Sequence, residues 1–166
     1  MKTIKTDLDA FEYVVQKLTE QNEKSMDMEE TCRYRGWPQS VIEEYNRLSF
    51  NEFVDESIEY FAKHDATLKC AVGHLISDLF YIPEIEGEGL NHEVYELVKA
   101  SNPDWETGDT YSDEDNSWYM LNDLQKIHDS YPVSEWGGFF DKMRENFNED
   151  QTYGYSIITM YSKGAL

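Results

Sequence analysis

The sequence has few basic residues. Its 166 residues include 14 Lys and Arg against 34 Asp and Glu, which gives a formal net charge of −20. Direct binding to nucleic acid requires clustered Lys and Arg side chains that neutralise phosphates. The deficit therefore argues against nucleic acid as a direct ligand, and it favours a basic protein as the partner.

Long apolar segments and cysteines are also scarce. No apolar run approaches the roughly 20 residues of a membrane span, and the N-terminal residues 1–5 lead into a charged amphipathic segment instead of the apolar core of a signal peptide. Two cysteines, Cys32 and Cys70, are too few for a disulfide framework. We therefore expect a cytoplasmic protein with reduced thiols and no membrane partner.

Motifs of catalysis are missing as well. The sequence contains no Gly-rich phosphate loop, no G-x-S-x-G turn and no H-E-x-x-H helix. Paired carboxylates for acid–base chemistry cannot be singled out among 34 acids. The sequence therefore predicts no enzyme and no cofactor.

Aromatic residues, in contrast, are abundant. The chain has 4 Trp, 12 Tyr and 8 Phe, and each such side chain buries roughly 150–250 Å² in a core. Disordered acidic chains are poor in aromatics, so the composition favours a folded protein. Nothing rich in Pro, Gly or Ser separates two halves, and the length fits a single compact domain spanning residues 1–166.

The apolar spacing predicts a mainly α (α+β) fold of about six helices with a small β element. Leu8, Phe11 and Leu18 share one face of a helix over 7–22, for which Thr6 and Asp7 supply the N-cap chemistry. A short strand at 31–36 would close with the turn at 36–38, and alternating apolar residues predict a second strand at 153–159. The other predicted helices are 40–45, leading into 50–61, then 67–76, 92–100, 117–127 (capped by Ser117) and 132–147.

Acidic residues are concentrated in one third of the chain. Between Asp78 and Asp123 there are thirteen acidic side chains and a single basic one, Lys99, whereas the first 77 residues hold nine basic side chains. Such a surface repels itself and makes folding more costly. It is either a solvated, solubilising surface or a surface that competes with DNA for a basic groove.

The charge can be compared with that of DNA. B-DNA carries one negative charge per ~1.7 Å of axis, and a compact domain of this length has a diameter of about 40 Å. DNA of that length holds roughly 24 charges, so a net charge of −20 is similar in total. Because a sphere shows only part of its charge to one partner, mimicry of DNA requires an elongated shape, a polarised charge distribution or a homodimer.

The candidate contact residues follow from this hypothesis. Carboxylates in the acidic segment would occupy phosphate positions, and Trp105 and Tyr111 would supply specific contacts, because Trp and Tyr are favoured interface anchors. Trp118 and Tyr119 fit the rim of the core equally well. The predicted phosphate mimics are Glu84, Glu86, Glu88, Asp104, Glu106, Asp109, Asp113, Glu114 and Asp115.

An alternative hypothesis is a metal site. Cys70 and His74 stand four residues apart and would share one face of a helix, and Cys32 and His128 could complete a four-ligand zinc site. Strong zinc signatures contain two close pairs, whereas this chain has one. The other interpretation is a buried structural cysteine beside a hydrogen-bonded histidine, in apolar surroundings that raise the pKa of a thiol.

Four short motifs carry a resemblance to a known group of proteins. They are C-x-Y-R-G at 32–36, C-A-x-G-x-L-I at 70–76, Y-x-P-E-x-E-G at 81–87 and L-Q-x-x-H-D at 124–129. With these motifs the chain resembles a group of small, acidic, uncharacterised proteins from bacteria and their phages. The resemblance implies a bacterial or phage origin and a small soluble fold. In that group a few residues join the first two motifs, so residues 37–68 are expected to form a helical insertion.

These observations predict a binding protein encoded by a phage or mobile element. It would inhibit a host nucleic-acid-binding defence complex of the restriction or CRISPR type by imitating DNA. The alternatives are a small metalloprotein or enzyme centred on Cys32, Cys70, His74 and His128, and a soluble adaptor whose acidity only keeps it in solution.

Overall fold

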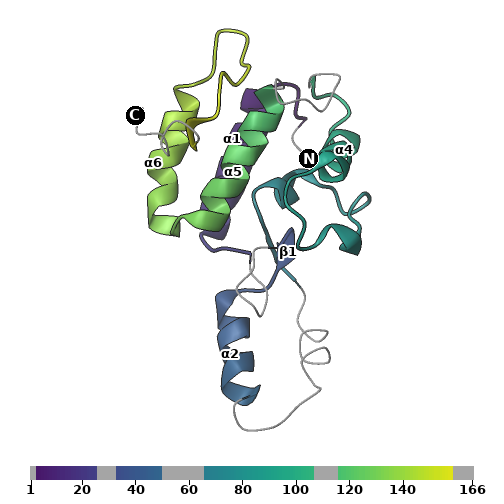
Figure 1. Cartoon of the computed structure of the whole chain (residues 1–166), viewed down its shortest axis with the longest axis vertical. Helices are drawn as coiled ribbons and strands as arrows, with labels where there is room; N and C mark the ends of the chain where they lie inside the picture. Colours follow the sequence, from purple (N-terminus) through teal and green to yellow (C-terminus); the bar gives the residue numbers. More distant parts are fainter. Residues whose placement is uncertain (1–2, 26–32, 50–65, 107–115, 159–166) are drawn as a thin grey trace.

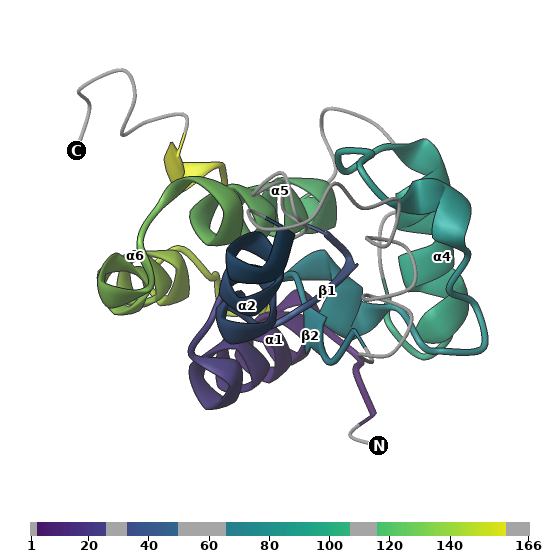
Figure 2. The same cartoon turned by 90° about the horizontal axis from the view of Figure 1, so that it is seen from below.

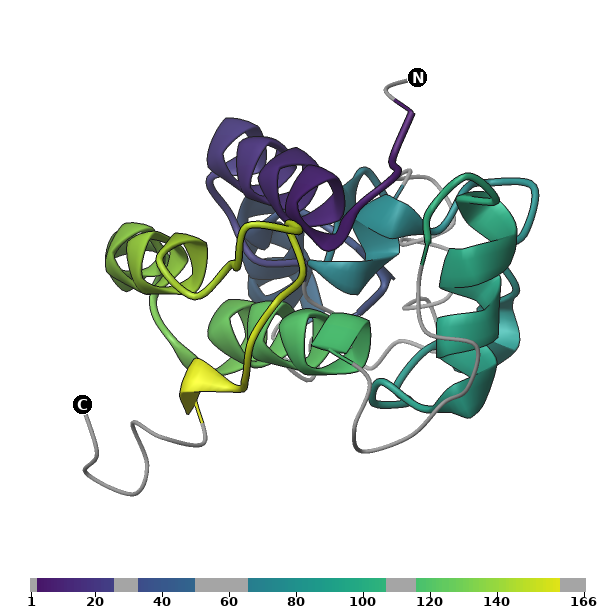
Figure 3. The same cartoon turned by 90° about the horizontal axis from the view of Figure 1, so that it is seen from above.

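The computed structural model describes residues 3–25, 33–49, 66–106 and 116–158 (Figure 1). Within these ranges the protein is mainly α with one two-stranded antiparallel sheet, as the sequence predicts. Figures 1, 2 and 3 all place α6 and α4 on opposite sides of α5. The elements in chain order are α1 (Asp7–Gln21), β1 (Arg35–Gly36), α2 (Gln39–Ser49), β2 (Leu68–Lys69), the 3₁₀ helices η1 (Val72–Leu75) and η2 (Pro83–Ile85), α4 (His92–Ser101), α5 (Asn116–Ser130) and α6 (Val133–Arg144).

Helix α1 confirms the prediction for residues 7–22. The Thr6 side chain accepts a hydrogen bond from the backbone N–H of Asp9 at 3.1 Å, which caps the first turn. At the other end, Asn22 takes the left-handed conformation (φ 50°), and its N–H donates to the Leu18 carbonyl at 2.8 Å. The local capping signals therefore fix both ends of this helix.

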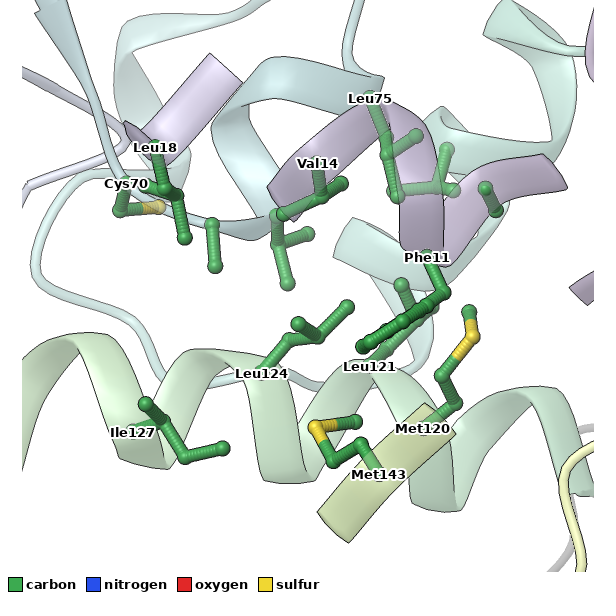
Figure 4. Close-up of a cluster of buried hydrophobic side chains, with 14 of the residues drawn as sticks. Phe11, Val14, Leu18, Cys70, Leu75, Met120, Leu121, Leu124, Ile127 and Met143 are labelled. Atoms are coloured by element: carbon green, nitrogen blue, oxygen red, sulfur yellow. The ribbon is translucent and has the colours of Figure 1, made fainter. Parts of the chain in front are cut away.

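The core lies between α1, α5, η1 and α6 (Figure 4). Phe11 and Val14 of α1 point toward Leu121 and Leu124 of α5, and all four side chains are fully buried. Fully burying a side chain of this kind stabilises the fold by about 1.5–3 kcal/mol. Further core residues are Leu18, Cys70, Leu75, Met120, Ile127 and Met143.

Strands β1 and β2 form a short ribbon at the base of α2. Arg35 pairs with Lys69, and Gly36 pairs with Leu68. The Gln21 amide extends the ribbon, because its Oε1 accepts from the Lys69 N–H at 3.0 Å and its Nε2 donates to the Lys69 carbonyl at 3.1 Å. The two strands bring Gly36 next to Leu68, and Figure 1 shows α2 extending away from the other helices.

The predicted helix at 67–76 is wrong. This segment forms β2 and then the four-residue 3₁₀ helix η1. Its amides bind side chains: the Val72 N–H donates to Gln125 Oε1 at 3.2 Å, and the Gly73 N–H donates to Cys70 Sγ at 3.3 Å. A Cβ on Gly73 would lie 2.4 Å from the Tyr34 carbonyl oxygen, so the segment passes directly against the backbone of residue 34.

The predicted strand at 153–159 is also wrong in its described part, which ends at residue 158. Tyr153 makes an isolated bridge with Phe147, and Ile157 is already helical. The reason is the buried carboxylate of Asp123, which accepts hydrogen bonds from Tyr153 Oη at 2.9 Å, Ser156 Oγ at 2.6 Å and the Ile157 N–H at 2.7 Å. Burial raises the pKa of this carboxyl above its usual range, against the opposing effect of these donors.

The remaining helices match the predictions with small differences at their ends. The Asn91 side chain caps α4 by accepting from the Val94 N–H at 3.0 Å, and α6 begins directly after Pro132.

The expected N-cap role of Ser117 is wrong, because this residue lies inside α5 and its Oγ donates to Asp7. Ser40 stands inside α2, which extends to Ser49. The helix predicted at 50–61 and the first two residues of the strand predicted at 31–36 lie outside the described residues.

Candidate functional site

The candidate site is the acidic lobe, defined here as residues 78–106. It contains η2 and α4 together with the turns around them, on the side of the molecule away from α6 (Figure 1). Its sequence holds eight acidic residues and one basic residue, Lys99. Lys99 lies 3.6 Å from Glu96 and therefore offsets one of these charges.

Seven carboxylates of the acidic lobe are exposed, and two of them, Asp78 and Glu96, are paired with basic side chains. The carboxylates of the other five make no hydrogen bond or ion pair with the described part of the chain and face solvent. Glu84 lies within η2 and Glu88 follows it, and the other three stand near the two ends of α4. The five residues are Glu84, Glu88, Glu93, Asp104 and Glu106.

Glu86 plays a different part from the neighbouring Glu84 and Glu88. Its carboxylate is half-buried and accepts from the Tyr34 N–H at 3.0 Å, the Arg35 N–H at 2.9 Å and Tyr81 Oη at 2.8 Å. Burial, together with the bond to Glu86, raises the pKa of Tyr81 to about 12, so the phenol stays protonated as a donor. Glu86 thus fastens the acidic lobe to β1, and we correct the prediction that it is free to replace a phosphate.

Asp78 begins the acidic lobe and is also paired. It lies 2.6 Å from the Arg35 guanidinium and 3.1 Å from Lys69 Nζ, and its hydrogen bond with Lys69 lowers the pKa of the carboxyl. The Arg35 guanidinium also stacks 3.8 Å from the centre of the Tyr81 ring. The two basic side chains of the β ribbon are therefore held against the acidic lobe.

Trp105 is buried, which corrects the prediction that it supplies contacts to a partner. Its side chain is 6% exposed, and its Nε1 donates to Asp7 Oδ1 at 3.1 Å. The same buried carboxylate accepts from Ser117 Oγ at 2.6 Å and from the Tyr153 N–H at 3.2 Å, so Asp7 joins four segments of the chain. Trp118 is half-buried and packs edge-on against Tyr95, at the rim of the core.

Five of the predicted contact residues cannot be placed. They fall in 107–115, outside the described residues, and nothing in the structure bears on them. They are Asp109, Tyr111, Asp113, Glu114 and Asp115.

Two residues of the metal hypothesis, His128 and Cys70, have other partners in the fold, whereas His74 Nε2 is buried without a hydrogen-bond partner among the described residues. His128 is buried; its Nε2 accepts from the Ser25 N–H at 3.3 Å, and its Nδ1 lies 2.9 Å from Asp129 Oδ1, which makes Nδ1 the protonated nitrogen. Burial raises the pKa of the Cys70 thiol well above its usual range, and burial lowers the pKa of His74 to about 4. Both nitrogens of His128 are therefore engaged, and Cys70 is a poor nucleophile.

No group of three or more His, Cys, Asp or Glu side chains in the described ranges could hold a metal ion. Cys32, the fourth residue of the hypothesis, lies outside those ranges. The described geometry favours the interpretation of Cys70 as a packed thiol, and we do not propose a metal site.

Sequence reasoning missed an exposed apolar turn. Leu79 is 84% exposed and Phe80 is 37% exposed. The residues from Leu79 to Ile82 form an apolar run, and such a composition is more typical of a buried segment. The signal in the sequence is Asp78, a charged residue directly before the run.

The fold and the site define a small, mainly α protein with an acidic lobe on one side. No protein-family model, curated protein or solved structure matches the chain. The motif resemblance therefore stays an expectation. None of the described helices has the length and apolar character needed to cross a membrane.

Proposed function

We propose that this protein binds a basic, nucleic-acid-binding surface of another protein, with carboxylates of the acidic lobe in place of phosphates. The observation that carries the proposal is the set of five exposed carboxylates between Glu84 and Glu106 that have no partner among the described residues; they lie in η2, in α4 and in the loops beside them. Lys99, the one basic residue among them, already pairs with Glu96.

The size of the acidic lobe can be compared with DNA. Helix α4 has 10 residues and is therefore about 15 Å long. Glu84, Glu88 and Glu93 precede it or lie in its first turn, and Asp104 and Glu106 follow its end. B-DNA carries about nine charges over the same length. The five carboxylates are thus about half as many charges as DNA carries over the length of this one helix.

In this proposal the protein is encoded by a phage or mobile element. Its partners are host nucleic-acid enzymes with a basic channel, such as restriction or CRISPR complexes. Association should be fast at low salt because the two surfaces attract each other before contact. Salt screens that attraction beyond about 10 Å at 0.1 M ionic strength. Direct binding to nucleic acid is not part of the proposal, since like charges repel.

The test is displacement of DNA from purified enzymes. A labelled duplex is bound to a restriction endonuclease or to a CRISPR surveillance complex, and the protein is added at low and at high salt. We compare wild type with Glu84→Lys/Glu88→Lys. The matched control is Glu145→Lys/Glu149→Lys, which changes two exposed glutamates at the same spacing beyond α6.

We expect wild type and the control to release the duplex at low salt, and the acidic-lobe variant to do so about tenfold less well. High salt should weaken the wild-type effect. Glu86 is left unchanged, because its loss would break three internal hydrogen bonds and disturb the fold. Equal displacement by both double variants, or failure to displace DNA at low salt, would contradict the proposal.

A further inference from the structure

The turn before η2 carries two exposed apolar side chains. Leu79 is 84% exposed and Phe80 is 37% exposed; the other exposed large apolar residue among those described is Tyr155, at 49%. Single exposed apolar residues are common on protein surfaces. Leu79 and Phe80, however, are neighbours on one turn, at the edge of the acidic lobe.

Hydrogen bonds hold this turn in one conformation. The N–H groups of Phe80 and Tyr81 both donate to the Ser77 carbonyl at 3.0 Å, and the Leu79 N–H donates to Ser77 Oγ at 3.2 Å. The Ser77 N–H in turn donates to Ser101 Oγ of α4 at 3.0 Å. A side chain presented on a fixed turn loses little conformational freedom when it enters a pocket.

The charges around the turn indicate what can cover it. Asp78 of the same turn is paired with Arg35 and Lys69, whereas the exposed carboxylates of Glu84 and Glu88, which follow within one short segment, have no partner among the described residues. A second copy of this chain would bring identical carboxylates together, which is unfavourable. A protein surface with Lys and Arg around an apolar pocket matches both features.

We propose that Leu79 and Phe80 form the apolar anchor of the interface, in contact with apolar side chains that lie among the basic residues of the partner. This inference rests on the function proposed above and adds the chemical character of the partner. The carboxylates would set the rate of association and its salt dependence, whereas the anchor would slow dissociation. The occupant is therefore a basic protein segment or surface that also presents apolar side chains, and a purely charged polycation would not reproduce the contact.

Two synthetic peptides of equal length and equal positive charge provide the probes, one of Arg and Gly and the other of Arg and Leu. Their affinities are measured for wild type, for Leu79→Ser/Phe80→Ser and for the control Tyr155→Ser. We expect wild type and the control to bind the Arg–Leu peptide about tenfold more tightly than the Arg–Gly peptide. The affinity of Leu79→Ser/Phe80→Ser for either peptide should equal the affinity of wild type for the Arg–Gly peptide. Circular dichroism checks that all three proteins are folded.

The outcomes separate the two proposals. Equal affinity of wild type for the two peptides, or a preference that survives Leu79→Ser/Phe80→Ser, overturns the anchor and leaves the electrostatic function standing. If wild type binds neither peptide at low salt, the proposed function fails, and the anchor that rests on it fails with it. A preference lost in Tyr155→Ser would place the apolar contact elsewhere and also overturn the anchor.

Discussion

Replacing Gly73 by Ala should destabilise this protein more than any other change of one methyl group that we can identify in its described part. A Cβ added at this position would lie 2.4 Å from the Tyr34 carbonyl oxygen and 3.2 Å from the Tyr34 carbonyl carbon. Both atoms belong to the backbone, so no side-chain rotation relieves the overlap. Either η1 or the residues leading into β1 must move until the closest contact is at least 3.0 Å.

The size of the effect follows from what that movement disturbs. Overpacking of a tight core contact costs about 1–3 kcal/mol. Moving Tyr34 also strains the hydrogen bonds that its own N–H and that of Arg35 donate to Glu86, and bonds to a charged acceptor contribute about 1.5–3 kcal/mol each. Partial loss of these bonds brings the total to about 2–4 kcal/mol, or a fall in Tm of about 5–15 °C for a chain of this size.

The assay is thermal and urea unfolding of Gly73→Ala beside Gly138→Ala. Gly138 lies within α6 and has open space around its Cβ position, so Ala there should stabilise the helix by about 0.5–1 kcal/mol. A Gly73→Ala protein as stable as wild type would refute the predicted clash. An equal loss of stability in both variants would also refute it, because the contact with the Tyr34 backbone exists only at Gly73.

Three further predictions concern buried polar groups. Asp123→Ala should cost about 3 kcal/mol in urea unfolding, because three donors lose their acceptor, and Asp123→Asn should cost clearly less; equal costs would contradict this. The pKa of His74 is 6.5 in the unfolded chain, and burial lowers it to about 4 in the folded protein. Between these two pH values the unfolded chain therefore binds a proton that the folded protein does not. Stability should therefore fall by about 2–3 kcal/mol as pH drops between these values, and His74→Gln, but not the exposed His92→Gln, should remove that dependence. In Cys32→Ser, mass spectrometry should show that iodoacetamide labels Cys70 only upon unfolding, because burial raises the pKa of its thiol and keeps it protonated; rapid labelling of the folded protein would contradict this.

The helices that could be predicted from sequence have local signals. Thr6 and Asn91 are capping residues directly before α1 and α4, and the apolar residues behind them repeat at helical spacing. The segment 67–76 has no capping residue directly before it and no helical spacing of its apolar residues. An almost continuous apolar run fits a helix and a strand equally well. In the structure this segment has distant partners: Gly73 lies against the backbone of Tyr34, thirty-nine positions earlier in the chain, and the Val72 N–H donates to Gln125.

In the candidate site, too, some features could be predicted from the local sequence and others depend on contacts with distant residues. The polarised charge was visible in the sequence, because it depends only on composition along the chain. The sequence could not show which acidic and aromatic side chains are available to a partner. Glu86 accepts hydrogen bonds from the backbone N–H groups of Tyr34 and Arg35, and Trp105 donates one to Asp7 of α1. Both partners are distant in sequence, and nothing near Glu86 or Trp105 in the chain indicates them.

The most direct test of the central claim is to map the binding surface by NMR. Isotope-labelled protein is titrated with the Arg–Leu peptide at low salt, and shifts of the backbone amide signals are recorded along the chain. We predict that the largest shifts fall within 78–106, and that they decrease in Glu84→Lys/Glu88→Lys. Shifts centred on α6, or spread evenly over the molecule, would show that the negative charge of this protein is a solvated surface and not a binding site.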